Sequence, residues 1–304
     1  MLCHVTNQIR FNPCSPICCI SLHANVMPIV QLDSPALRIS DLRKAYLSRD
    51  GRVVQAVTSF SVDVIRGERL AILGPSGCGK STILRILSGL DAQFGGTIDW
   101  ANDASADAKK QLRSATVFQG ESTLPWMTIS ENLTAGLSGL KLDADTIKRR
   151  LDYHLRLVGL SEFASAYPHE LSGGMRQRAA IARALATEPL LLLMDEPLAA
   201  LDAQTRLIMQ KELHWIWKQT QSTVVYITHD IEEAISLADR LLVMTARPGR
   251  IKAILDVPFG REVEPFERRR SAAFAELQAK VWSMVAEEVG QSLTSLETSK
   301  GASA

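Results

Sequence analysis

Apolar and polar residues along the chain follow two periodicities in turn, and this pattern predicts an α/β protein. Residues 37–42 and 57–64 alternate between apolar and polar positions, the former as in a strand at the edge of a sheet. Further short segments with a strand pattern lie at residues 70–74, 97–100, 116–118, 190–194, 223–228 and 240–244. Helical spacing separates most of these segments, and strands that alternate with helices form a mostly parallel sheet.

A longer segment between Ile129 and Glu188 interrupts this alternation and is expected to be mostly helical. Thr128 and Glu131 have the spacing of a capping box, which marks the start of a helix. We therefore predict a helical subdomain at about residues 121–180, inserted into an α/β domain that spans residues 35–259.

The regions on either side of this domain have different patterns. Residues 1–34 lack periodicity and helix caps, so we expect a disordered extension. Translation that starts at Met27 would leave out residues 1–26 of this extension. In residues 260–304 one face of an amphipathic helix is traced by Phe274, Leu277, Val281, Met284 and Val285. The last fifteen residues are rich in Ser, Thr and Gly, and we expect them to form a disordered tail.

Composition narrows the classes of function. The 304 residues are 46% hydrophobic and 22% charged, which is ordinary for a soluble globular protein, and the net charge of +1 gives no basic footprint of nucleic-acid binding. No apolar stretch reaches the roughly 18–20 residues that span a bilayer, so any membrane step requires a partner. Four of the five cysteines lie within the first 19 residues: Cys3, Cys14, Cys18 and Cys19. Metal binding by this group is the less favoured alternative to disorder, because no second ligand pair accompanies it.

A glycine-rich segment at residues 74–81 fits the pattern G-x-x-x-x-G-K-[ST] and lies between a predicted strand and a predicted helix. Glycines allow the backbone N–H groups and the helix N-terminus to surround phosphate groups. Lys80 is expected to reach the β- and γ-phosphates of a nucleotide, and the Ser81 hydroxyl to ligate Mg²⁺. The predicted ATP-binding residues of this segment are Gly74, Pro75, Ser76, Gly77, Cys78, Gly79, Lys80, Ser81 and Thr82. We also expect the amides and Lys80 to lower the pKa of the Cys78 thiol.

Two acidic residues follow the apolar run 190–194, at the end of a strand where ligands bind in open α/β sheets. Asp195 is suited to hold Mg²⁺, and Glu196 to act as the general base for an attacking water. His229 ends another strand, which places it where it could sense the γ-phosphate.

The sequence Leu171-Ser172-Gly173-Gly174-Met-Arg-Gln177 predicts a second anion site, because a Ser-Gly-Gly turn opens a helix there. It resembles the signature sequence of the ABC ATPase family. The resemblance covers roughly residues 37–259 and implies a P-loop NTPase core of RecA type, an antiparallel β subdomain and an inserted helical subdomain. It also implies a head-to-tail dimer, in which the residues Leu171, Ser172, Gly173, Gly174 and Gln177 cap the ATP of the partner.

Further positions match the family pattern in order along the chain. Tyr46 stands where the family has an aromatic residue that stacks on adenine. Gln119 matches the glutamine that meets Mg²⁺ and the attacking water, and His229 matches the switch histidine. Asp202 lies in the loop that crosses to the partner subunit, although Ala199 and Ala200 depart from the serine that usually begins this loop. The resemblance thus implies Glu196, His229 and Gln119 as catalytic residues, and Ser81, Gln119 and Asp195 as the Mg²⁺ ligands.

Three stretches, at residues 124–132, 195–206 and 246–251, are similar to the ATPases of nitrate, sulfonate and taurine importers. This similarity implies a peripheral subunit on the cytoplasmic face of the inner membrane, with membrane permeases and, indirectly, a periplasmic or lipid-anchored solute-binding protein as partners. It implies no nucleic acid partner. The alternatives are import of a thiamine-precursor pyrimidine by the same architecture and a non-transport ABC ATPase. A P-loop kinase is disfavoured, because it would need no Ser-Gly-Gly turn.

Overall fold

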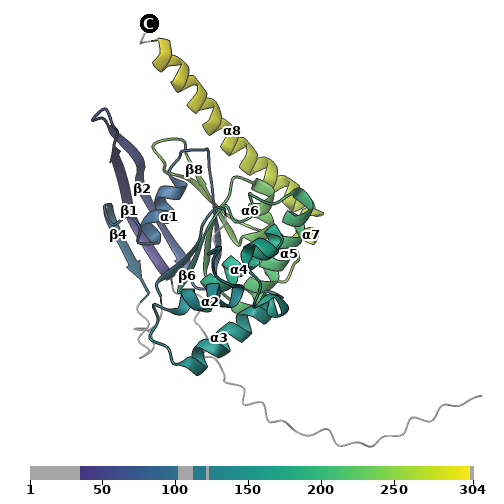
Figure 1. Cartoon of the computed structure of the whole chain (residues 1–304). Coiled ribbons are helices and arrows are strands. Elements are labelled where there is room, and N and C mark those ends of the chain that lie inside the picture. The colour runs from purple at the N-terminus through teal and green to yellow at the C-terminus, as the bar shows by residue number, and fades with distance from the viewer. Residues whose placement is uncertain (1–34, 102–111, 121–122, 302–304) are drawn as a thin grey trace, which may run out of the picture. The chain divides into compact units, whose positions relative to one another are not determined.

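The computed structural model describes residues 35–101, 112–120 and 123–301 (Figure 1). These residues fall within one compact unit of the chain, Leu32–Ala304. The predictions made for residues 1–34, including the cysteine group and the start at Met27, lie outside the described residues.

A six-stranded sheet forms the centre of this unit, with the strand order β5-β6-β7-β3-β8-β9. Its strands are β3 (Arg69–Leu73), β5 (Ser114–Val117), β6 (Leu191–Asp195), β7 (Val224–Ile227), β8 (Arg240–Met244) and β9 (Ile251–Asp256). All neighbouring strands pair in parallel except β9, which pairs antiparallel with β8 at the edge. The predicted α/β core with a mostly parallel sheet is therefore confirmed.

A second, antiparallel sheet contains β2 (Val53–Ile65), β1 (Pro35–Leu47) and β4 (Gly95–Trp100), in that order. The prediction that residues 37–42 form an edge strand is wrong, because β1 pairs with β2 on one side and with β4 on the other. The alternation of apolar and polar residues in β1 reflects one buried and one more exposed face. Such alternation is typical of antiparallel sheets and does not distinguish an edge from a centre.

Eight α-helices are present among the described residues. They are α1 (Lys80–Leu87), α2 (Ile129–Leu137), α3 (Ala144–Leu157), α4 (Gly173–Ala186), α5 (Ala203–Thr220), α6 (Ile231–Leu237), α7 (Pro265–Arg269) and α8 (Ala272–Gly301). The predicted capping box starts α2: the Thr128 hydroxyl accepts from the Glu131 N–H, and the Glu131 carboxylate accepts from the Thr128 N–H. Helices α2, α3 and α4 thus occupy the segment that the sequence marked as helical.

The six-stranded sheet separates two hydrophobic cores, because successive side chains of a strand point to opposite faces. Leu70 and Ile72 of β3 pack with α1 and the three-stranded sheet. Ala71 and Leu73 pack on the opposite face with residues of α2 to α6 and α8. Each fully buried Leu or Ile contributes about 1.5–3 kcal/mol. The central strands are apolar on both faces for this reason, and their carboxyl ends are held firmly in place.

The C-terminal helix α8 packs on the second core through Phe274, Leu277 and Val281, as predicted. The helix continues to Gly301, however, where a disordered tail was expected after residue 289. The physical reason is that this stretch contains no proline, and extending an existing helix through Ser and Thr costs only some tenths of a kcal/mol per residue relative to Ala. None of the helices in the described ranges is long and apolar enough to span a membrane.

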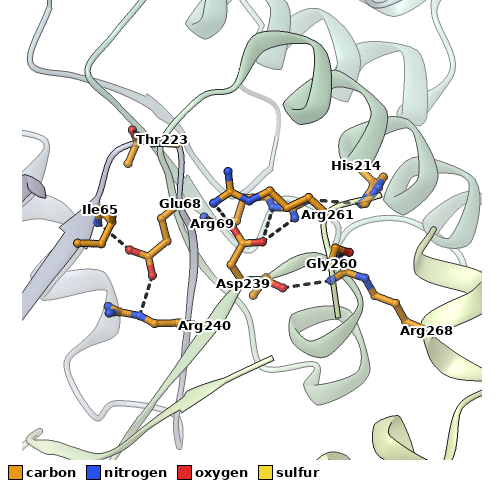
Figure 2. A network of polar contacts seen from close by, with 12 residues as sticks. Ile65, Glu68, Arg69, His214, Thr223, Asp239, Arg240, Gly260, Arg261 and Arg268 are labelled. Carbon is orange, nitrogen blue, oxygen red and sulfur yellow. Dashed lines mark hydrogen bonds and ion pairs between the residues drawn. The ribbon is translucent and has the colours of Figure 1, made fainter. Parts of the chain in front are cut away.

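A network of charged residues holds the amino ends of β3 and β8 together (Figure 2). The Asp239 carboxylate pairs with Arg69 at 2.6 Å and with Arg261 at 2.9 Å. Burial opposes ionisation of Asp239, but the hydrogen bonds and charge of Arg69 and the charge of Arg261 outweigh it, so the pKa of Asp239 lies below its ordinary value. Beside it, Glu68 pairs with Arg240 at 2.7 Å, although burial raises the pKa of Glu68.

Candidate functional site

The glycine-rich loop connects β3 to α1 at the carboxyl edge of the sheet. Gly79 precedes α1 with a left-handed φ of 106°, and no side chain caps the helix there. A Cβ at Gly79 would come within 2.7 Å of a Val57 methyl group and 2.9 Å of the Ala56 carbonyl oxygen. Lys80 is buried, and its ammonium group donates to the carbonyls of Gly74 at 2.8 Å and Pro75 at 2.9 Å. The loop is therefore compact, and the start of α1 has N–H groups that no side chain caps. Both features suit the binding of a phosphate group.

Cys78 in this loop differs from its prediction. The side chain is 1% exposed, and burial raises the pKa of the thiol. The charge and hydrogen bonds of Lys80 act in the opposite direction but do not outweigh burial. The expectation of a lowered pKa is wrong, because the sequence shows the neighbouring charge but not the packing that encloses the sulfur atom.

The three predicted catalytic residues meet at one carboxylate. Glu196 directly follows β6, with a left-handed φ of 45°, and its N–H donates to the Ile227 carbonyl of β7 at 2.9 Å. The Gln119 amide donates to Glu196 Oε2 at 3.1 Å, while His229 Nδ1 lies 3.2 Å from Glu196 Oε1. Each carboxylate oxygen thus has a different partner, and the partners follow β5 and β7, the strands on either side of β6. Side chains far apart in the sequence converge because the carboxyl ends of parallel strands lie at the same edge.

Asp195 is the last residue of β6, next to this cluster. Burial raises the pKa of Asp195, the negative charge of Glu196 raises it further, and Lys80 opposes both. Asp195, Ser81 and Gln119 offer carboxylate, hydroxyl and amide oxygen atoms, which are the hard donors that Mg²⁺ prefers. Within the described ranges no group of three or more His, Cys, Asp or Glu side chains could hold a metal ion.

The Ser-Gly-Gly turn opens α4, as predicted. Ser172 is the N-cap of the helix, and its hydroxyl accepts from the Met175 N–H at 3.3 Å. A Cβ at Gly174 would lie 3.3 Å from the Thr205 methyl group, so the start of α4 packs closely on α5. Gln177 lies one turn further along α4, and its amide nitrogen is buried with no hydrogen-bond partner among the described residues.

Asp202 and Tyr46 have local contacts in this structure. Asp202 is the N-cap of α5, where its carboxylate accepts from the N–H groups of Gln204 and Thr205, and hydrogen bonding to Thr205 lowers its pKa. The Tyr46 hydroxyl donates to Asp91 at 3.2 Å, and the Lys44 ammonium lies 4.9 Å from the centre of the Tyr46 ring. The Tyr46 side chain is 38% exposed, which leaves part of it open to solvent.

Two residues of the site were missed by the sequence analysis. Arg247 and Gly249 lie in the turn between β8 and β9 and contact the glycine-rich loop at Gly77 and Cys78. The stretch 246–251 was noted only as a pattern shared with certain importer ATPases. The Pro and Gly in this stretch indicate a tight turn at a sheet edge. They do not indicate which loop the turn contacts.

Comparisons with known proteins agree with this geometry. Residues 57–199 match the family model described as "ABC transporter". An uncharacterized ABC transporter ATP-binding protein of Methanocaldococcus jannaschii is 40% identical, over 84% of this chain and 94% of that protein. An aliphatic sulfonates import ATP-binding protein of Bacillus cereus is 40% identical, over 78% of this chain and 90% of that protein. A nitrate import ATP-binding protein of Synechocystis is 43% identical, over 76% of this chain and 86% of that protein.

A solved structure is similar as well. It is the dimeric, post-hydrolysis state of an ATP-binding cassette bound to ADP and phosphate, with a TM-score of 0.60 and 28% identity. The match covers 74% of this chain and all of that one. This chain contains the glycine-rich loop, the Ser-Gly-Gly helix start and the strand-end carboxylates, and its relatives are ATP-binding proteins of ABC transporters. The chain therefore belongs to the ABC transporter family, as an ATP-binding subunit with ATPase activity.

Proposed function

We propose that this chain hydrolyses ATP to drive import of a small solute through a separate membrane permease. The observation that carries the proposal is the convergence of Gln119 and His229 on the two oxygen atoms of Glu196. Two of the relatives are an aliphatic sulfonates import ATP-binding protein and a nitrate import ATP-binding protein, which supports a solute of the nitrate, sulfonate or taurine type. A thiamine-precursor pyrimidine is the second candidate within the same architecture.

Nucleotide binding in this proposal begins at the loop of residues 74–79. The ATP phosphates lie against the loop and the start of α1, where Lys80 exchanges its carbonyl partners for the β- and γ-phosphates. Ser81, Gln119 and Asp195 hold Mg²⁺, which supplies charge neutralisation at the phosphates when bound. Burial and the charge of Glu196 raise the Asp195 pKa, and the ionised form of this carboxyl would be favoured beside such an ion. Tyr46 stacks on the adenine through the exposed part of its ring.

Hydrolysis in this proposal depends on Glu196 as the general base. The carboxylate accepts a proton from the attacking water, so it must be fixed in direction before the γ-phosphate is attacked. The hydrogen bond from Gln119 and the contact with His229 restrict both oxygen atoms. His229 is 66% exposed on its side chain, so it remains accessible to the γ-phosphate from the side of the solvent.

Two copies of the chain complete each site. The Leu171–Gln177 segment of one copy caps the ATP held by the loop of the other, head to tail, and Asp202 lies in the segment that crosses between them. The dimeric structure of the similar ATP-binding cassette supports this arrangement. The start of α4 supplies backbone N–H groups of the kind that bind the γ-phosphate of the partner site.

The permease is the second partner, and we propose that it docks beside α2. Trp126 is 70% exposed in the loop just before this helix, a few residues beyond Gln119. An exposed Trp is a common binding anchor, because it buries a large area at a small entropic cost. The subunit would then lie at the cytoplasmic face of the membrane, and a solute-binding protein would act on the permease from the other side. No nucleic acid partner is proposed.

Co-expression with the permease of the same operon tests this function. Vesicles that contain the complex should show ATPase activity stimulated by one of nitrate, taurine, an alkanesulfonate or a hydroxymethylpyrimidine, each added with its binding protein. Trp126→Ala should weaken permease association by about 2 kcal/mol and abolish uptake, while ATPase activity of the free subunit is unchanged. Phe266→Ala, at an equally exposed aromatic residue on α7, serves as the control. A free subunit that loses ATPase activity with Trp126→Ala would make Trp126 a packing residue.

A chain that associates with no permease would favour the rival function, a non-transport ABC ATPase. No permease in the operon and no solute stimulation of ATPase activity would point the same way. These results would leave the assignment of ATPase activity unchanged, but they would contradict the proposed role in transport.

A further inference from the structure

The turn between β8 and β9, residues 245–250, has no role in the function proposed so far. Its shape is closed by its own hydrogen bonds: the Thr245 N–H donates to the Arg250 carbonyl at 2.9 Å, and the Arg250 N–H donates to the Thr245 hydroxyl at 3.0 Å. The Thr245 hydroxyl also donates to the carbonyl of Ala246 or Pro248. A turn fixed in this way can transmit a displacement from one neighbour to another.

One side of the turn contacts the phosphate loop. Arg247 Nε donates to the Gly77 carbonyl at 3.2 Å. Because the peptide unit is planar, a bond that holds the Gly77 carbonyl also sets the direction of the Cys78 N–H on the other side of that unit. Gly249 packs so closely on Cys78 that an added Cβ would overlap the Cys78 carbonyl oxygen. The turn therefore contacts two consecutive residues of the phosphate loop, Gly77 and Cys78.

The same turn is anchored to β2. The Gly249 N–H donates to the Ala56 carbonyl, and the Thr58 N–H donates to the Gly249 carbonyl, both at 2.9 Å. These bonds fix Gly249, but they leave the Ala246–Arg247 part of the turn to be positioned by other contacts.

The other side of the turn contacts the C-terminal helix α8. Glu288 is 6% exposed, and its Oε2 accepts from the Ala246 N–H at 2.8 Å. Its Oε1 pairs at 2.7 Å with Lys252, which also donates to the Met284 carbonyl of α8 at 3.2 Å. Burial opposes ionisation of Glu288, but the hydrogen bonds from Lys252 and Ala246 outweigh burial and lower its pKa. A buried, paired carboxylate thus ties α8 directly to the residue that precedes Arg247.

We propose that the 245–250 turn is a brace through which α8 positions the phosphate loop for ATP, with Arg247 and Glu288 as positioning residues. The alternative is that the turn only fills space between β2 and α8. Packing alone does not require a charge-assisted bond to the Gly77 carbonyl or a buried carboxylate on the Ala246 N–H, and hydrogen bonds to charged groups are the stronger ones. The inference rests on the proposed function, in which the loop holds the phosphates of ATP.

The loop side of the brace is tested by Arg247→Ala in the full-length chain, with a fluorescent ATP analogue and Mg²⁺ in an equilibrium titration. Arg247 is exposed, so we expect the dissociation constant and the KM for ATP to rise about two- to fivefold, the loss expected for one hydrogen bond open to solvent. The kcat at saturating ATP should stay within about twofold, because the Glu196 cluster is untouched. Arg250→Ala removes the same charge from the same turn and should have no effect. Equal ATP binding by the two variants would overturn the proposal.

The helix side is tested by Glu288→Ala against Glu287→Ala, which removes the neighbouring partner of Lys252 but not the bond to Ala246. Glu288→Ala alone should weaken ATP binding, and Glu288→Gln should restore part of the affinity, because the amide oxygen still accepts from Ala246. In the Arg247→Ala background Glu288→Ala should add little, since both act through one turn. Full additivity, or no effect of Glu288→Ala in a protein that melts normally, would remove α8 from the brace. A wild-type chain that bound no nucleotide would instead contradict the proposed function.

Discussion

The amino and carboxyl ends of the parallel strands hold their acidic residues in different ways. At the amino ends Asp239 lies between Arg69 and Arg261, and Glu68 pairs with Arg240, so each acid has an arginine within 3 Å (Figure 2). At the carboxyl ends Glu196 is held by a glutamine and a histidine instead. Burial raises the pKa of Asp195 there, with a further contribution from the charge of Glu196.

This difference separates a structural edge from a functional one. Arginine partners at the amino edge compensate the buried carboxylates within the protein itself. The carboxyl edge leaves acidic groups whose charge is better compensated by a cation or a ligand, which is a usual property of active sites. We therefore expect substitutions at the amino edge to change stability, and substitutions at the carboxyl edge to change catalysis.

The largest expected effect is that of Glu196→Gln on turnover. Loss of a general base lowers the rate by about 10²- to 10⁴-fold, while the amide keeps the size of the side chain and an acceptor for Gln119. The melting temperature should change by no more than about 2 °C, and ATP should still bind. Steady-state ATPase assays and thermal unfolding on the same preparation measure both quantities. Turnover near the wild-type rate would remove Glu196 from the role of base.

Asp239→Asn should produce the opposite result at the amino edge. The guanidinium of Arg69 is nearly buried, so removing its charged partner should cost about 3 kcal/mol in the free energy of unfolding. The KM for ATP should stay within about twofold. Asp63→Asn is the control, because its pair with Arg38 is largely exposed, and exposed ion pairs contribute little to stability. Urea unfolding followed by circular dichroism compares the two, and equal losses would contradict the assignment of Asp239 to a structural edge.

The smallest expected effect is a pH dependence from Glu233 on α6. Burial, and then the charge of Asp230, raise the pKa of Glu233 to about 8 in the folded state. Between about pH 4.5 and pH 8 the unfolded chain has lost this proton while the folded chain keeps it, so stability falls as the pH rises. Glu233→Gln removes this contribution, and its stability relative to wild type should grow by up to about 1.4 kcal/mol per pH unit in that window. Urea unfolding at pH 6 and pH 8 measures the change, and a constant difference would refute it.

Local sequence patterns predicted which residues lie at most of the carboxyl edge. The phosphate loop, Asp195 and Glu196 each follow a short apolar run, and a parallel sheet necessarily brings the carboxyl ends of such runs together. The meeting of Gln119, Glu196 and His229 follows from the same property, since each residue directly follows a strand or lies within two residues of its end, although only the family resemblance pointed to Gln119.

Features that depend on distant pairing were not predictable in the same way. The central position of β1 is decided by β4, which lies about 50 residues further along the chain and shows only a weak strand pattern. The contact of Arg247 with Gly77 depends on a turn 170 positions away. The enclosure of Cys78 depends on a core that combines α1 with strands from distant parts of the chain. Periodicity reports the exposure of a segment but not the identity of its neighbours, and these are the places where the predictions were wrong or silent.

The place of β3 in the sheet order has a consequence for synthesis. This strand carries the phosphate loop, yet it hydrogen-bonds only to β7 and β8, and Arg69 at its start bonds to Asp239, 170 residues later. At about 5–20 residues per second a ribosome needs on the order of ten seconds or more to cover that interval. For most of that time both edges of β3 lack their native partners, because β7 and β8 have not yet been made. The nucleotide site is therefore encoded early and assembled late, and this interval is when the newly made chain has most need of a chaperone.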